Sequence, residues 1–419
     1  MGKLVITGGV PLVGELAVQG AKNSALPLLA AAVLVKGKTV LHNCPDLTDV
    51  DAACKILSYL GCRIHREGSS VEVDASGISR YDVPDDLMRE MRSSIVFLGA
   101  ISARMYAAQI SFPGGCELGP RPIDLHLMGL RQLGLQIKEE YGLLDCELQA
   151  SRFVGSRISF SFPSVGATEN IMLAAATALG QTIISNAAQE PEITALAEFL
   201  NQCGAKIYGA GKSTIVIEGV PTLTETEYRV IPDRIVAVTY LCAAAATGGE
   251  ILLTDVLTDQ LDSVFPVLDQ MGCKLKITEK SVYLKAPLRL KATKTVRTMP
   301  YPGFPTDAQA PVMAVASLAA GTTMFVENVF ESRYKHVGEL ARMGANIKVE
   351  GKVAVVEGVR SLYGANVEST DLRGGAALVI AGLSASGVTT VGNLNHIDRG
   401  YEAIEVNLAE LGGRIHRET

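Results

Sequence analysis

The stretch LSYLGCRI, Leu57–Ile64, recurs in variant form six times along this chain of 419 residues. The other copies are LRQLGLQI from Leu130, LNQCGAKI from Leu200, LDQMGCKL from Leu268, LARMGANI from Leu340 and LAELGGRI from Leu408. Their glycines lie 68 to 73 residues apart, a step longer than that of solenoid repeats, which run to about 50 residues. The chain is therefore predicted to use one supersecondary unit six times, so function must lie where the six copies differ.

Each copy predicts the same order of elements, α-β-loop-α-β-β. An Ala-rich apolar helix comes first, and in most copies a glycine after it is expected to stop the helix and start a short strand. A second, amphipathic helix ends at the glycine of the octapeptide, and a hairpin follows. Both helices should pack on one side of a small sheet. The Ala-rich segments are NSALPLLAAAVL, RSSIVFLGAISA, TENIMLAAATAL, RIVAVTYLCAAAA, AQAPVMAVASLAA and RGGAALVIAGLSA.

The most polar connector, PTLTETE at Pro221–Glu227, separates the third copy from the fourth. We place a domain boundary there, with three units on each side. The first twenty residues precede the first copy and read as strand, turn and strand. These two strands could pair with either domain.

Composition bounds the class of protein. Hydrophobic residues make up 48% and charged residues 20%, as expected for a compact α/β protein. The net charge of −6 and the lack of Trp argue against a nucleic-acid platform. The longest apolar run, Ala25–Val35, is too short to span a bilayer. The N-terminus lacks the pattern of a secretory signal, so a cytoplasmic protein is expected.

The eight cysteines form no CxxC pair and have no histidines at metal-ligand spacing, which predicts buried thiols, no disulfide and no metal.

Charged residues recur at two places in the unit, the start of the Ala-rich helix and the loop after its strand. Helix N-termini favour anions, and cations from several units would together enclose a strongly anionic small molecule. Any one of these residues, taken alone, could be a solvated surface charge, and each aspartate could be a helix N-cap. The helix starts carry Lys22, Asn23, Arg92, Asp233, Arg234, Asp307, Asp371 and Arg373, and the loops carry Arg121, Arg333 and Arg399.

The second unit departs most from the pattern, because its loop is extended to FPGGCELGPRPIDLH, Phe112–His126. Three glycines and three prolines around one thiol predict a mobile flap. Cys116 is thus the cysteine expected to be exposed, with Arg121 and His126 near it in sequence. Cationic neighbours lower the pKa of a thiol and favour reactivity. The alternative is an accidental loop cysteine.

Seven motifs together resemble the UDP-N-acetylglucosamine 1-carboxyvinyltransferase family of enolpyruvyl transferases, and the resemblance covers the whole chain. It implies an α/β fold of two inside-out α/β barrel domains, each of three βαβαββ units. Residues 22–229 would form the N-terminal domain that carries the Cys116 flap, and residues 1–21 with 230–419 the C-terminal domain. The motifs are GAKNSALPLLAAAVL (20–34), PGGCELGPRPIDLH (113–126), SVGATENIMLAAA (164–176), FPTDAQAP (304–311), ENVFESRYKHVGEL (327–340), TDLRGGAALV (370–379) and HIDRGYEAIE (396–405).

The resemblance also implies a reaction. The enolpyruvyl group of phosphoenolpyruvate would move to the 3′-hydroxyl of UDP-N-acetylglucosamine with release of phosphate, in the first committed step of peptidoglycan synthesis. Cys116 would be the general acid and could carry a phosphoenolpyruvate adduct, and Asp307 would be the base. Lys22, Arg121 and Arg399 would hold the phosphate and carboxylate, and the catalytic set would be Cys116, Asp307, Lys22 and Arg399.

The implied binding residues divide between the two substrates. No cofactor, metal, nucleic acid or membrane insertion is implied, and sugar-nucleotide binding is expected to close the flap by induced fit. Phe162 stands where some family members carry a basic residue, which removes one side-chain contact to the nucleotide. Phosphoenolpyruvate would contact Lys22, Asn23, Arg121, Asp371, Arg373 and Arg399. UDP-N-acetylglucosamine would contact Asn23, Arg92, Arg121, Pro122, Ile123, Asp124, Leu125, Ser164, Val165, Gly166, Asp307 and Val329.

Three other functions remain open at this point. The first is the related enolpyruvyl transfer to shikimate 3-phosphate, although that enzyme lacks the cysteine flap and its Gly-Asn-Ala-Gly-Thr segment is absent from this chain. The second is a catalytically silent paralogue that binds UDP-N-acetylglucosamine as a sensor. The third is a scaffold without a ligand, which would leave the recurring Lys, Arg and Asp residues unexplained.

Overall fold

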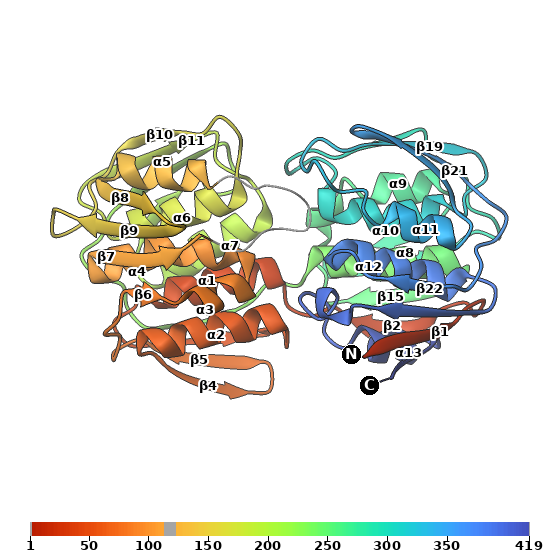
Figure 1. Ribbon diagram of the computed structural model, residues 1–419, viewed down its shortest axis with the longest axis horizontal. Coiled ribbons are helices and arrows are strands. Elements are labelled where there is room, and N and C mark those ends of the chain that lie inside the picture. Colours follow the sequence, from red (N-terminus) through yellow and green to blue (C-terminus); the bar gives the residue numbers. More distant parts are fainter. Residues whose placement is uncertain (1, 113–122, 419) are drawn as a thin grey trace. The chain divides into compact units, whose positions relative to one another are not determined.

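The computed structural model describes residues 2–112 and 123–418 (Figure 1). Its described residues cluster into two compact units. The first unit comprises residues 20–112 and 123–231, and the second comprises residues 2–19 and 232–418. Each unit has its own hydrophobic core.

The first unit contains three repeats of one pattern, in which a lead strand precedes a central helix, a central strand, an outer helix and a hairpin. The first repeat consists of β14 (Thr226–Arg229), α1 (Lys22–Ala32), β3 (Lys38–His42), α2 (Thr48–Leu60), β4 (Arg63–Glu67) and β5 (Ser70–Asp74). The second consists of β6 (Asp82–Val83), α3 (Asp85–Glu90), η1 (Arg92–Val96), α4 (Phe97–Met105), β7 (Ala107–Ser111), α5 (Asp124–Gln132), β8 (Leu135–Glu140) and β9 (Leu143–Leu148). The third consists of β10 (Arg157–Ser159), α6 (Val165–Ala175), β11 (Gln181–Ser185), α7 (Pro191–Gln202), β12 (Lys206–Tyr208) and β13 (Thr214–Glu218).

The second unit repeats the pattern. The fourth repeat of the chain is the first of this unit and consists of β2 (Val13–Ala17), α8 (Arg234–Thr247), β15 (Glu250–Thr254), η2 (Thr258–Leu261), α9 (Phe265–Gln270), β16 (Lys274–Ile277) and β17 (Ser281–Lys285). The fifth consists of β18 (Thr295–Arg297), α10 (Thr306–Ala316), β19 (Thr322–Val326), α11 (Val337–Arg342), β20 (Asn346–Glu350) and β21 (Val353–Glu357). The sixth consists of β22 (Asn366–Glu368), α12 (Leu372–Ser384), β23 (Val388–Gly392), η3 (Leu394–His396), α13 (Ile404–Glu410), β24 (Arg414–Glu418) and β1 (Lys3–Thr7).

Every repeat forms a four-stranded sheet with the same strand order in the described part of the chain. The lead strand pairs parallel to the central strand, as in β10 with β11, and the hairpin then adds antiparallel strands. The βαβαββ unit is thereby confirmed. The order α-β-loop-α-β-β predicted from the repeats did not include the lead strand. The lead strands are short, and a lead strand can lie far in sequence from its partner, as β14 does from β3.

Both N-terminal strands belong to the second unit, which settles the question that the sequence left open. β2 is the lead strand of the fourth repeat and pairs with β15. β1 pairs with β23 and β24 and completes the sixth sheet. Lys3 lies opposite Glu418 in that pairing, and an ion pair of 3.1 Å joins their side chains. Lys3 and Glu418 thus lie where the other repeats have a hairpin turn.

The glycine of the octapeptide ends the outer helix in all six repeats, as predicted. Gly61, Gly134, Gly204, Gly272, Gly344 and Gly412 have φ angles from 88° to 104°, which is the left-handed region that only glycine occupies readily.

The prediction for the glycine after the Ala-rich helix was partly wrong. α8 does end at Gly248, whose φ is 71°. However, α6 ends at Ala175, and Gly180 lies five residues further on, at the turn into β11. The reason is local: after Ala175 the backbone tightens into i→i+3 bonding, and the Ala178 amide donates to the Ala175 carbonyl at 3.0 Å.

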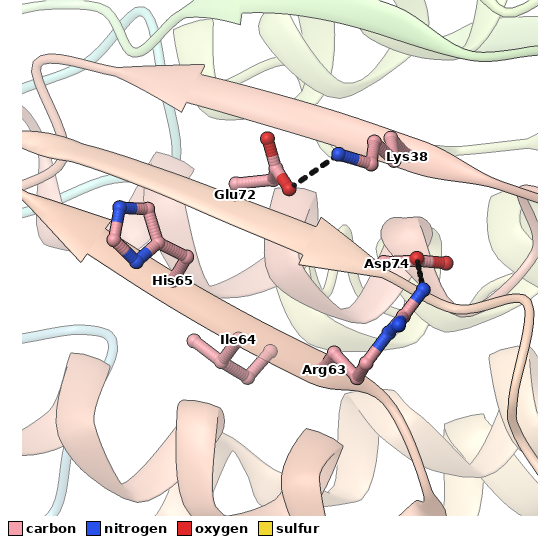
Figure 2. Close-up of a pocket in the computed structure, with 6 residues that line it drawn as sticks. All are labelled: Lys38, Arg63, Ile64, His65, Glu72 and Asp74. Atoms are coloured by element: carbon pink, nitrogen blue, oxygen red, sulfur yellow. Dashed lines mark hydrogen bonds and ion pairs between the residues drawn. The ribbon is translucent and has the colours of Figure 1, made fainter.

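The central helices form the inside of each unit, and the sheets lie outside them. α8, α10 and α12 pack against one another, and Figure 1 shows them side by side with β15 on one flank and β19 and β21 on the other. Their residues are buried nearly all round, which the alanines and glycines permit because small side chains allow close approach. The outer sheet faces carry charged pairs instead, such as Lys38–Glu72 and Arg63–Asp74 on the first sheet (Figure 2).

The turn after the central strand distinguishes the middle repeat of each unit. Among the described residues, a left-handed Asn or Asp follows the strand in the other four repeats, at Asn43, Asn186, Asp255 and Asn393, with φ of 51–55°. In the first, third and fourth repeats the next amide bonds to the hairpin, as the Ala187 amide does to the Ser213 carbonyl at 3.0 Å. In the middle repeats Phe112 and Glu327, the residues directly after β7 and β19, make this bond themselves. At this position the two middle repeats therefore lack the left-handed turn.

Candidate functional site

The structure describes most of the predicted site residues. Cys116, Arg121 and Pro122 lie outside the described residues, so the predicted flap cysteine and its neighbouring arginine stay predictions. The remaining residues divide into one group in each unit and lie at the starts of helices or on loops.

Asp307 is the hub of the group in the second unit. It lies in the first turn of α10, and Arg333 donates to its Oδ1 at 2.9 Å. Arg373 donates to its Oδ2 at 3.2 and 3.3 Å. The side chains of both arginines are only 2% exposed, whereas the Asp307 side chain is 28% exposed. The carboxylate is thus the accessible part of an otherwise buried ionic group.

Both arginines are fixed by further contacts. Arg333 also donates to the Thr306 carbonyl at 2.9 and 3.2 Å, which ties it to the start of α10. Arg373 donates to the Tyr401 hydroxyl at 3.1 Å, and that hydroxyl lies 2.9 Å from the Thr239 hydroxyl on α8. Burial lowers the pKa of Arg373, but Tyr401 and the carboxylate of Asp307 outweigh it, so the pKa lies above its ordinary value. The guanidinium therefore stays charged.

Asp371 has a structural task. Its Oδ1 accepts from the amides of Arg373 at 3.1 Å and Gly374 at 3.0 Å, so it is the N-cap of α12. Asp233 caps α8 in the same way. Asp307 does not cap α10, because its carboxylate bonds to the arginines and Pro305 holds the N-cap position. Asp307 instead pairs with two arginine side chains.

Glu327 organises the loop that carries Val329. Its carboxylate accepts from the Thr306 hydroxyl at 3.1 Å and from the amides of Val329 at 2.8 Å and Phe330 at 3.0 Å. The Val329 amide is therefore occupied, so a nucleotide contact at Val329 would have to use its carbonyl or its side chain. Glu327 is 1% exposed.

Lys22 opens the group in the first unit. It is the first residue of α1, and its Nζ lies 2.9 Å from Oδ2 of Asp49 in the first turn of α2. The two side chains are 10% and 3% exposed. Asn23 follows Lys22 in α1 and is half-buried. Arg92 also lies at the start of a helix, as predicted, but that helix is the η1 turn that leads into α4.

His126 on α5 lies beside Gly166, one of the predicted nucleotide residues on α6. Ser164 caps α6 by accepting from the Ala167 amide at 3.4 Å. A Cβ at Gly166 would lie 3.0 Å from the His126 ring, so any other residue there would press against the imidazole. His126 Nδ1 lies 3.1 Å from the Asn170 side-chain amide. Ile123 is buried, whereas Asp124, at the start of α5, is exposed and Leu125 is half-buried.

The expectation that His126 adds positive charge near the cysteine flap was wrong. Burial, and then the nearby Arg92, lower the pKa of His126 from 6.5 to about 4. The imidazole is therefore neutral at pH 7. Any lowering of the Cys116 pKa would have to come from other groups, such as Arg121.

Arg399 lies on the loop between η3 and α13 and is half-buried. No pattern in the sequence points to several residues that the structure adds to these groups. Asp49 and Glu327 are ordinary acidic residues in their local patterns, and Tyr401 is an aromatic residue near a helix start. Only their buried contacts with Lys22, Thr306 and Arg373 single them out.

Other kinds of site are absent from the part of the chain that the structure describes. No cluster of three or more His, Cys, Asp or Glu residues there could hold a metal ion. No helix among the described residues is long and apolar enough to cross a membrane. The hollow drawn in Figure 2, lined by Lys38, Arg63, Ile64, His65, Glu72 and Asp74, lies on the outer sheet face and contains none of the predicted site residues.

Known proteins are similar to this chain in both sequence and fold. Residues 6–408 match the family EPSP synthase (3-phosphoshikimate 1-carboxyvinyltransferase). The chain is 52% identical over 417 residues to UDP-N-acetylglucosamine 1-carboxyvinyltransferase 2 of Caldanaerobacter subterraneus subsp. tengcongensis, covering 100% of both chains. It is 47% identical over 418 residues to UDP-N-acetylglucosamine 1-carboxyvinyltransferase of Nitratidesulfovibrio vulgaris, again covering 100% of both.

Among solved structures, the enolpyruvyl transferase NikO from Streptomyces tendae superposes with a TM-score of 0.90 at 27% identity, covering 100% of this chain and 99% of that one. EPSP synthase from Acinetobacter baumannii has a TM-score of 0.76 at 20% identity over all of both chains, which shows the fold alone. The two-domain inside-out α/β fold is thereby confirmed. The chain is an enzyme of the transferase class, and it belongs to the enolpyruvyl transferases and, within them, to the UDP-N-acetylglucosamine 1-carboxyvinyltransferase family.

Proposed function

We propose that this protein transfers the enolpyruvyl group of phosphoenolpyruvate to the 3′-hydroxyl of UDP-N-acetylglucosamine, with release of phosphate, in the first committed step of peptidoglycan synthesis. The full-length identity of 52% to a relative named for this activity supports the substrates. The observation that carries the chemistry is the Asp307 group, in which an accessible carboxylate is held by Arg333 and Arg373.

Asp307 is the proposed base. Each carboxylate oxygen has two lone pairs, so an oxygen that already accepts from a guanidinium can still accept from the sugar hydroxyl. Because both arginines are buried and tied to other groups, the carboxylate keeps one orientation. A fixed acceptor within hydrogen-bond reach is what general-base catalysis requires.

The reaction proceeds by addition and then elimination. In the addition, Asp307 takes the hydroxyl proton, the sugar oxygen bonds to C2 of phosphoenolpyruvate, and the Cys116 thiol gives its proton to the methylene carbon, which becomes a methyl group. In the elimination, the Cys116 thiolate takes a proton back from that methyl group, the double bond re-forms, and the C2–O bond to phosphate breaks. The proton on Asp307 passes to the leaving phosphate. Both residues thus return to their starting states.

The proposed binding residues divide between the two substrates. Lys22, Arg121 and Arg399 bind the phosphate and carboxylate of phosphoenolpyruvate, supported by Asn23, Asp371 and Arg373. Since Asp371 caps α12, it acts by fixing Arg373. The sugar nucleotide contacts Asn23, Arg92, the stretch 121–125, Ser164, Val165, Gly166, Asp307 and Val329. Backbone N–H groups at the start of α6 suit its diphosphate.

Several wider expectations belong to the same proposal. The catalytic domains are residues 22–229 and residues 1–21 with 230–419. The sugar nucleotide binds first and closes the Cys116 flap by induced fit. The enzyme works in the cytoplasm, where its nucleotide and phosphoenolpyruvate substrates would be available.

Phosphate release and intact mass test the role of Cys116. Wild type should release phosphate only when both substrates are present, and Cys116→Ala should release none, while Cys116→Asp should retain activity because a carboxyl group can also deliver a proton. Mass spectrometry should show a phosphoenolpyruvate adduct on wild type and none on Cys116→Ala. Cys54→Ala is the matched control and should behave as wild type, because burial raises the pKa of Cys54 to about 11. Full activity of Cys116→Ala would overturn the assignment.

A further inference from the structure

The loop that carries Arg399 is fastened on both sides of that residue. Asp398 forms a two-point ion pair with Arg417 on β24, at 2.7 and 3.0 Å. Arg417 also bonds to Glu405 on α13 at 2.7 Å. On the other side, Tyr401 is 1% exposed and bonds to Arg373. These contacts hold the residues before and after Arg399, and a further residue bonds to the Gly400 carbonyl and the Glu402 amide.

That residue is Gln19. Its side-chain Nε2 donates to the Gly400 carbonyl at 3.4 Å, and its Oε1 accepts from the Glu402 amide at 2.8 Å. A carbonyl and an amide two residues apart are the groups that a strand offers to its neighbour. The Gln19 amide therefore acts as a short substitute for a neighbouring strand. Its orientation is fixed by chemistry, because exchanging its oxygen and nitrogen would oppose two donors and two acceptors.

Gln19 is itself held by the main chain. Its carbonyl accepts from the amide of Asp233, the N-cap of α8, at 2.9 Å. The preceding amide, of Val18, donates to Thr254 at the end of β15 at 3.0 Å. The side chain thus extends from a fixed backbone, and it connects the fourth repeat to the Arg399 loop of the sixth.

We infer that Gln19 is a positioning residue for Arg399 and thereby sets the affinity for the anionic groups of phosphoenolpyruvate. This inference rests on the proposed function, which assigns those groups to Arg399. Gln19 does not touch the reacting atoms. It fixes the backbone on the C-terminal side of Arg399, so that the guanidinium does not have to be ordered when the substrate binds.

Gln19→Met tests the inference, since it keeps the length of the side chain and removes both hydrogen bonds. We expect KM for phosphoenolpyruvate to rise about tenfold, as the loss of two ordinary hydrogen bonds implies, with KM for UDP-N-acetylglucosamine unchanged. Gln132→Met, at an exposed position on α5, is the matched control and should leave both constants unchanged. In an Arg399→Lys background, Gln19→Met should change KM less than about twofold if it acts through Arg399.

Hydrogen exchange separates this inference from the proposed function. Gln19→Met should expose the Glu402 amide to exchange while the melting temperature stays within a few degrees of wild type. If the amide is exposed but wild type turns over neither substrate, the proposed function fails and the contact stands. If wild type is active and KM for phosphoenolpyruvate is unchanged in Gln19→Met, or rises equally in the Arg399→Lys background, the positioning role is overturned.

Discussion

The Lys22–Asp49 pair of the first unit and the Asp307 group of the second both place buried charges at the start of a central helix, but they differ in composition. In the first unit, one ammonium meets one carboxylate at 2.9 Å, and both side chains are nearly inaccessible. In the second, Asp307 bonds to Arg333 and Arg373 and remains 28% exposed.

This difference separates two ways of using a buried charge. In the Lys22–Asp49 pair, the loss of either residue removes this buried ion pair from the other. In the Asp307 group, the loss of one arginine leaves the carboxylate paired with the other arginine. The loss of the carboxylate instead leaves both buried guanidinium groups without the counter-charge between them. The second arrangement therefore tolerates change at an arginine and depends on Asp307.

The largest effect is expected for Asp307→Asn, which keeps the shape of the side chain and removes its charge. Turnover should fall about 10²–10⁴-fold because the proposed base is lost. Stability should also fall by about 3–5 kcal/mol, because Arg333 and Arg373 lose a buried counter-charge. Steady-state kinetics and urea unfolding measure the two effects. An active Asp307→Asn enzyme would show that the base lies elsewhere.

The next comparison sets Asp49→Asn against Arg333→Met. Asp49→Asn should destabilise the protein by about 3 kcal/mol, as expected for breaking a buried pair. Arg333→Met should cost about 1–2 kcal/mol, in the range of hydrogen bonds to charged groups, because Asp307 keeps Arg373. Urea unfolding of both variants gives the order. A larger loss of stability for Arg333→Met than for Asp49→Asn would contradict the distinction between the Lys22–Asp49 pair and the Asp307 group.

Each unit also contains one buried histidine that should make the protein sensitive to acid. Burial lowers the pKa of both His126 and His336 from 6.5 to about 4. A folded pKa below the unfolded value means that stability is complete above about pH 6.5 and is lost as the pH falls toward 4. Each histidine should remove about 1.4 kcal/mol per pH unit in that window, or about 2 kcal/mol by pH 5.

Unfolding in urea at several pH values tests this, with His336→Leu as the informative variant. His336 is fully buried, so a leucine removes a titrating group and keeps the position filled by an apolar side chain. The loss of stability between pH 7 and pH 5 should fall to about half in the variant if the two histidines contribute equally. An unchanged pH slope would mean that His336 titrates normally.

The smallest effect is expected in the central strands. Thr182 of the first unit and Thr389 of the second are fully buried at the same strand position, and neither hydroxyl has a partner among the described residues. Thr→Val at either site should leave stability unchanged or raise it by up to about 1 kcal/mol, because a buried hydroxyl without a partner is unfavourable. A loss above that size in thermal unfolding would reveal an unrecognised hydrogen bond.

The sequence predicts the architecture better than the contacts of the site. The spacing of Gly61, Gly134 and their equivalents is a local backbone requirement, so it can be read from one chain. The short lead strands are not predictable in this way, because their partners lie far away in sequence, and β14 and β3 are an example.

The same limit applies to the site. Lys22 and Asp307 are visible as charges at helix starts, but their partners Asp49 and Arg373 come from other elements. Asp371 matches a functional motif and proves to be a helix cap. His126 looks cationic in sequence and is neutral because it is buried. Each of these differences arises from tertiary packing, which sets pairing and pKa values independently of local pattern.

Product analysis with different acceptors tests the central claim most directly. Phosphoenolpyruvate should be incubated with wild type and either UDP-N-acetylglucosamine or shikimate 3-phosphate, and both products and phosphate should be followed by mass spectrometry. The account predicts an enolpyruvyl ether of UDP-N-acetylglucosamine with one phosphate released per product, and no product from shikimate 3-phosphate. Product from shikimate 3-phosphate alone, or from neither acceptor, would contradict it.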